Sequence, residues 1–285
     1  MKNSKKWMKN YYVNYYWLLG FLVIISVALF SPGYGMIEGE FEKNMVFEEL
    51  FYYDKVNYLQ RINVYNSLSY VNVIFSKGFM YLALIFPSIS CMMRYCDELN
   101  SGYSKLIITR IGNNKYIGRT VLRTLATAFI ITFIALYVVY LIIYFRLPNV
   151  NEALGRTGSP ELLEGIGQMM DFKANGFLYV LRYIIPSSLF ACVAGLLSIL
   201  IATISHNKFL SLTIPILLIE AENSIFSGSS IAAIYKYKIR NFLYPFDDID
   251  PWFTWWEFGL FILTLCVVLI TVIYYVSGRR YRESE

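Results

Sequence analysis

The chain has 285 residues, of which 57% are hydrophobic and only 16% are charged. An ordinary soluble domain is about half apolar and about a quarter charged, so this composition excludes that class. His206 is the single histidine, which leaves little material for a His-based metal centre or a catalytic triad.

Long apolar segments recur along the chain and can each cross a hydrocarbon core about 30 Å thick. Backbone polar groups in lipid must be satisfied within the chain, so each segment is expected to be helical. The sequence therefore predicts an all-α, polytopic membrane protein in which residues 1–285 form a single transmembrane domain with six helices. The predicted spans are residues 16–30, 71–93, 124–145, 177–204, 209–226 and 257–276.

The distribution of charge predicts the orientation of these spans. Segments 1–15, 94–123, 205–208 and 277–285 share one side and hold 14 of the 25 basic residues but only four of the 20 acids. Lys and Arg are enriched in cytoplasmic loops, so both termini are expected in the cytoplasm and the loop of residues 31–70 outside. The net charge of +5 then reflects topology, and no nucleic-acid partner is expected.

Two further segments have patterns typical of a membrane interface. Trp7, Tyr11 and Tyr15 repeat every four residues among lysines, which predicts an N-terminal interfacial helix. The alternative is a disordered basic tail. Residues 231–244 are rich in apolar side chains and form either a short re-entrant helix or a helix in a surface loop.

The predicted cytoplasmic loop of residues 94–123 has a distinctive order of residues. Asp97 and Glu98 precede Gly102, and an apolar run from Leu106 to Ile108 leads into a polar turn and a basic helix. This order predicts a short amphipathic helix lying across the membrane face, which a partner protein can grip.

The loop resembles the first cytoplasmic loop of ABC-2-type transporter permeases, the membrane subunits of bacterial ATP-driven exporters. The residues that fit the pattern are Glu98, Gly102, Leu106, Thr109, Arg110, Ile111, Tyr116, Ile117 and Arg119. The six spans, the interfacial N-terminus and the short turn at residues 205–208 are also similar to that family.

The resemblance implies a permease that works with a cytoplasmic ABC ATPase and a second permease subunit in the bacterial cell membrane. It assigns ATPase coupling to Asp97, Glu98, Gly102, Leu106 and Arg110. Glu98 is expected to cap the loop helix and to meet a basic groove of the ATPase; the alternative is that Asp97 and Glu98 only solubilise a helix end. The cargo that the resemblance implies is a peptide or an amphipathic compound, as in antimicrobial-peptide export or immunity.

The chain itself has no phosphate-binding loop. The nearest segment, Gly112 to Thr120, has one residue too many between its glycines and has Arg119 in place of the lysine. We therefore expect no enzymatic activity and no cofactor in this chain, with ATP and Mg²⁺ bound by the partner ATPase.

Glu220 and Glu222 are candidates for a translocation path because ionisable groups at membrane depth usually face a helix bundle or water. Their i, i+2 spacing points them about 200° apart, so only one can line a path. Alternatively, the span ends at Ile219 and both lie at the interface. Two rival functions stay open: a stand-alone carrier or channel, and an intramembrane protease that uses Glu220, Glu222, His206 and the serines.

Overall fold

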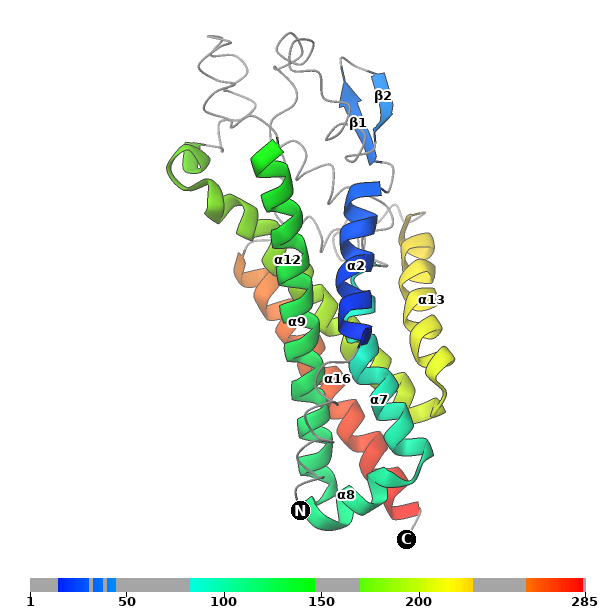
Figure 1. The fold of residues 1–285 in the computed structure, drawn as a ribbon. Helices are drawn as coiled ribbons and strands as arrows, with labels where there is room; N and C mark the ends of the chain where they lie inside the picture. The colour runs from blue at the N-terminus through cyan, green and yellow to red at the C-terminus, as the bar shows by residue number, and fades with distance from the viewer. Residues whose placement is uncertain are drawn as a thin grey trace, which may run out of the picture.

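The computed structural model describes residues 15–30, 33–37, 40–44, 83–146, 170–227 and 255–283, which are helical apart from one small hairpin (Figure 1). The elements in chain order are α2 (Tyr15–Phe30), β1 (Gly33–Ile37), β2 (Glu40–Asn44), η1 (Phe86–Ser88), α7 (Ile89–Asn100), α8 (Tyr103–Ile111), α9 (Asn113–Arg146), α12 (Met170–Ser205), α13 (Lys208–Ser227) and α16 (Trp255–Glu283).

Among the described residues, three helices are long and apolar enough to cross a membrane: Asn113–Ile142, Ile184–Ser205 and Glu257–Tyr281. Tyr16–Phe30 is a shorter apolar helix. The described chain is therefore that of a helical, multi-pass membrane protein. The N-terminal segment, residues 231–244 and the first part of the second predicted span lie outside the described residues.

The helix at the end of the second predicted span, residues 71–93, continues beyond residue 93. Pro87 lies in the 3₁₀ turn η1, and α7 then runs to Asn100. Proline has no N–H to continue an existing helix but suits the first turn of a new one. The Ser88 hydroxyl donates to the Ile85 carbonyl at 2.8 Å, which satisfies a backbone group at the break. The helix continues past residue 93 because the next break is at Gly102.

The hairpin is a strand element that the all-α prediction did not include. β1 and β2 pair antiparallel from Gly33 with Asn44 to Ile37 with Glu40. It falls within the predicted outer loop and lies beyond the end of α2, at the opposite end of the molecule from α8 (Figure 1).

The core is built around α12, which contacts α9, α13, α16 and α7. Small residues allow these helices to approach closely, as is common where lipid gives no hydrophobic drive between helices. A Cβ added to Gly195 of α12 would lie 3.1 Å from both the Ser88 Cβ and the Thr124 Cγ2. Ala128 of α9 and Ala191 of α12 are fully buried in the hydrophobic core between these helices.

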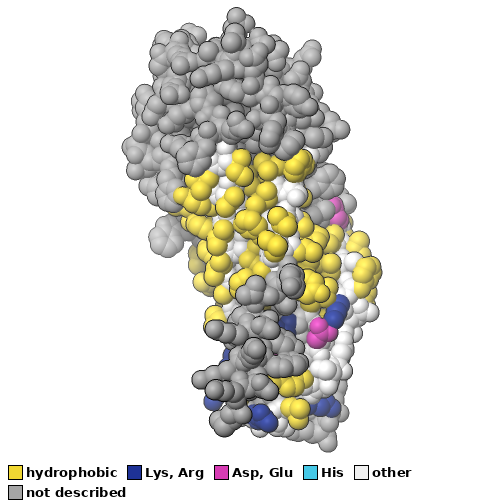
Figure 2. Space-filling model, viewed as in Figure 1, with side chains coloured by type: hydrophobic (Ala, Val, Ile, Leu, Met, Phe, Trp, Pro, Cys, Tyr) yellow, Lys and Arg dark blue, Asp and Glu magenta, His cyan; other side chains and the backbone are white. Residues whose placement is uncertain are grey.

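The outer surface is apolar where a soluble protein would be polar. Leu18, Leu122, Leu217 and Leu260 are 57%, 68%, 64% and 64% exposed on four different helices. Figure 2 shows an apolar band across the molecule, with charged side chains toward the end where α8 lies. Exposed apolar area on this scale requires a lipid or protein covering.

A close contact between α2 and η1 gives a test of this packing. A Cβ at Gly20 would lie 3.0 Å from the Pro87 Cα, whereas a Cβ at Gly259 meets no heavy atom within 4 Å. Gly20→Leu should therefore lower the unfolding free energy in detergent by about 1–3 kcal/mol through overpacking. The matched control, Gly259→Leu, should unfold like the wild type. Equal unfolding midpoints for the two variants would contradict the α2–η1 contact.

Candidate functional site

The predicted short helix of the cytoplasmic loop is present as α8 and is bounded by two glycines. Gly102 before it has φ +70° and Gly112 after it has φ +84°. Side chains are strained at such angles, which glycine adopts freely. The two glycines thus let the chain turn sharply on both sides of α8, which separates it from α7 and α9.

α8 has an inner and an outer side. Ser104 is buried, and Ile107 and Ile108 pack against the cluster formed by α7, α9 and α12. On the outer side, Leu106 is 60% exposed and Arg110, one turn later, is also exposed. The inner side fixes α8 to the bundle, and the outer side offers an apolar residue next to a cation.

Glu98 points inward and joins α7 to α9. Its Oε1 accepts a hydrogen bond from the Arg94 Nε at 2.7 Å, and its Oε2 accepts one from the Tyr116 hydroxyl at 2.9 Å. Its side chain is only 14% exposed. The N-terminus of α8 has no side-chain cap, so the structure places Glu98 in this link and not on the α8 amides.

Asp97 and Asn100 connect the end of α7 to the turn between α12 and α13. The Asp97 Oδ1 lies 2.5 Å from the Lys208 Nζ, and this partner raises the pKa of Lys208. Both side chains are well exposed, so the pair contributes at most about 1 kcal/mol. The Asn100 Nδ2 donates to the carbonyl of His206 at 2.9 Å. The last turn of α7 therefore binds α9 through Glu98 and the α12–α13 turn through Asp97 and Asn100.

The α12–α13 turn is fixed by residues on both sides. His206 adopts φ +53°, which is uncommon for a residue other than glycine. The Asn207 Oδ1 accepts the N–H of Phe209 at 2.8 Å and so caps α13. From α16, the Arg280 guanidinium donates to the carbonyl of Thr203 at 2.5 Å and contacts the His206 ring.

Arg280 is the residue that sequence reasoning missed. The sequence shows it only as one of the basic residues of segment 277–285, yet it satisfies carbonyl groups at the end of α12 that have no partner within that helix. The sequence shows a basic residue near the end of the last helix, but it does not show that this residue binds the end of α12, 77 residues away. α16 also reaches α9, because the Ser277 hydroxyl donates to the Asn113 Oδ1 at 3.2 Å.

These contacts bring the basic segments together at one end of the molecule (Figure 1). We call this the basic end and define it as residues 94–123, 205–208 and 277–283. The three segments were predicted to share one side of the membrane, and the structure joins them through side chains of α7, α9 and α16. Of the predicted coupling residues, Leu106 and Arg110 are exposed, whereas Glu98 is internal.

Glu220 and Glu222 lie far from this end. Glu220 is about 18 Å along α13 from Lys208, at 1.5 Å per residue. Both glutamates are partly buried and each takes part in an interaction. His206 lies two residues before Lys208, at the start of α13, so Glu220 and Glu222 do not meet it. Within the described residues there is no group of three potential metal ligands.

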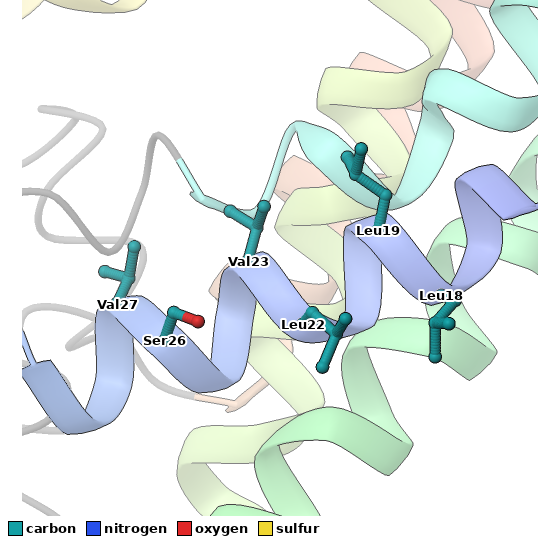
Figure 3. A pocket seen from close by; sticks show the side chains of 6 residues that line it. All are labelled: Leu18, Leu19, Leu22, Val23, Ser26 and Val27. Carbon is teal, nitrogen blue, oxygen red and sulfur yellow. The ribbon is translucent and has the colours of Figure 1, made fainter.

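An apolar hollow of about 350 Å³ lies along α2. It is lined by Leu18, Leu19, Leu22, Val23, Ser26 and Val27 (Figure 3). The lining has one hydroxyl and no charged group, so these residues offer no catalytic or ionic chemistry.

Neither a family model, nor a curated protein, nor a solved structure matches this chain. The fold itself defines the class: a multi-pass helical membrane protein with a basic end that gathers three separate segments.

The environment of His206 predicts that the folded protein loses stability at acidic pH. Burial, and then the Arg280 guanidinium, lower the pKa of His206 below its usual value of 6.5. The folded state therefore binds the proton less readily than the unfolded chain, so stability is full above pH 6.5 and falls as the pH drops below it. Measurements of the thermal unfolding midpoint between about pH 7.5 and about pH 5.5 should show this fall.

His206→Asn is the matched variant, because asparagine tolerates a positive φ and does not titrate. Since the chain has no other histidine, the variant should have a flatter pH profile over this range. Parallel profiles for the variant and the wild type would contradict the assignment.

Proposed function

We propose that this chain is the membrane-spanning permease subunit of a bacterial ABC exporter, driven by ATP that a separate ATPase subunit hydrolyses. The observation that carries the proposal is α8, a short helix set between two glycine turns with one side fixed and one side exposed. Its resemblance to the coupling loop of ABC-2-type permeases supports the same role.

The contacts around α8 explain how force on it would reach the spans. The chain enters α8 from α7 and leaves it into α9, and Glu98 links those two helices directly. Asn100 binds the carbonyl of His206 in the α12–α13 turn, and Arg280 of α16 binds the carbonyl of Thr203 next to that turn. These bonds connect α7 to α16 through the turn. A displacement of α8 by a closing ATPase would therefore move several spans together instead of one loop.

The exposed side of α8 defines the chemistry of the ATPase surface. Tyr103 is 54% exposed and Leu106 is 60% exposed, so the partner must supply an apolar groove. Lys105 and Arg110 flank them and are also exposed, so acidic groups are expected at the rim of that groove. ATP and Mg²⁺ belong to the partner in this scheme.

The rest of the proposal concerns the assembly. The basic end faces the cytoplasm, as the positive-inside pattern favours, and both termini lie on that side of the cell membrane. A second permease subunit completes the pathway, because the described helices pack around a filled core. The cargo class proposed is a peptide or an amphipathic compound, with Glu220 or Glu222 lining the path.

Capture of the ATPase tests this function. The tagged chain is purified from its native cells in mild detergent, and co-purifying proteins are identified by mass spectrometry. Leu106→Ala should reduce the recovered ATPase about tenfold, which corresponds to a loss of about 1.4 kcal/mol at the apolar anchor of the interface.

Leu260→Ala is the matched control, since Leu260 is 64% exposed on α16 and lies outside the basic end. It should recover the ATPase as the wild type does. Equal recovery with all three chains would show that α8 is not the docking helix. Recovery of no ATPase by the wild-type chain would contradict the proposed function itself.

A further inference from the structure

Apart from Asn114, the exposed residues in the described part of α9 form one stripe that begins with two cations. The stripe consists of Lys115, Arg119, Leu122, Ala126, Ile130 and Ile134. Steps of three or four residues keep these positions on one side of the helix. The same side of α9 therefore presents positive charge near its start and bare hydrocarbon along the following turns.

The two cations are available to a ligand. Within the described part of the chain, neither Lys115 nor Arg119 has an ion-pair partner, and no residue of the stripe is acidic. They lie about 6 Å apart along the helix axis, so both can contact a single phosphate group. Arg123, beside the stripe, is half-exposed and takes part in another interaction.

The apolar part of the stripe has the length of one lipid leaflet. Leu122, Ile130 and Ile134 are 68%, 51% and 48% exposed. From Leu122 to Ile134 the helix rises about 18 Å, compared with about 15 Å for half of a hydrocarbon core. Arg119 then lies one turn before the hydrocarbon, at the level of lipid headgroups, and Lys115 lies one turn further out.

We propose that this stripe of α9 binds an anionic phospholipid, with its phosphate held by Lys115 and Arg119 and an acyl chain along Leu122 to Ile134. The order of charge and hydrocarbon along one helix face matches the order within such a lipid. The exposed apolar side of α16, which includes Leu260, Leu263, Val267 and Tyr275, leads instead to Arg279, which already takes part in an interaction.

Occupancy of this site would reinforce the basic end. In the first turns of α9, Lys115 and Arg119 lie on the outer side and Tyr116 lies on the inner side, where its hydroxyl donates to Glu98. A ligand that binds only the folded chain stabilises it in proportion to its concentration relative to Kd. Anionic lipid would thus hold the start of α9 in the position that the link to α7 requires.

A lipid titration tests the proposal. The purified full chain in a neutral detergent is titrated with phosphatidylglycerol or phosphatidylcholine, and the thermal unfolding midpoint reports binding. Phosphatidylglycerol should raise the midpoint and phosphatidylcholine should not. The double variant Lys115→Gln with Arg119→Gln should weaken the apparent affinity about fivefold for each cation lost.

Two further variants separate the stripe from net charge and from misfolding. Lys105→Gln with Arg110→Gln removes the same charge from α8 and should bind phosphatidylglycerol within about twofold of the wild type. Lys115→Arg with Arg119→Lys keeps both charges on the stripe and should do the same. Equal weakening by the two charge-removing variants would overturn the proposal. Competition by glycerol phosphate as strong as by phosphatidylglycerol would also overturn it, because the site would then recognise a soluble anion.

Discussion

A carboxylate that is largely removed from water must keep ionic or hydrogen-bonded partners, and in this molecule the Glu98 carboxylate does so by joining two helices. One oxygen accepts from Arg94 in its own helix, and the other accepts from Tyr116 across the α8 loop. Breaking this arrangement would leave a partly buried charge with fewer donors, which is costly. The Glu98 carboxylate therefore holds the end of α7 and the start of α9 together, and α8 lies between them.

The other contacts of the basic end extend this link. Asn100 reaches the carbonyl of His206, and Arg280 satisfies carbonyls at the end of α12, so the α12–α13 turn is fixed by both α7 and α16. Each bond satisfies a backbone group that a helix end would otherwise leave unpaired. In the proposed permease, the loop that meets the ATPase is consequently continuous with the helices that would form the pathway. The outward stripe of α9 places the same assembly against lipid headgroups.

Much of the fold was predictable because its signals are local. Apolar length located α2, α12, α13 and α16, and the glycines and apolar run of residues 102–112 located α8. The direction of the Glu98 side chain was not predictable, because its partner Tyr116 lies 18 residues away and on another helix. Arg280 meets Thr203 across 77 residues, a distance over which helix packing alone decides the pairing. Pro87 is a candidate kink site in the sequence, but its role in a 3₁₀ turn that starts a new helix was not predictable, because hydropathy does not register where a helix begins.

The link between Glu98 and Tyr116 is the central claim, and a double-mutant cycle measures it directly. The unfolding free energy in mixed micelles is determined for the wild type, Glu98→Ala, Tyr116→Phe and the double variant. A hydrogen bond to a charged group predicts a coupling free energy above about 1 kcal/mol, with the double variant less destabilised than the sum of the single variants. Additive effects within about 0.5 kcal/mol would show that α7 and α9 are not joined through this carboxylate.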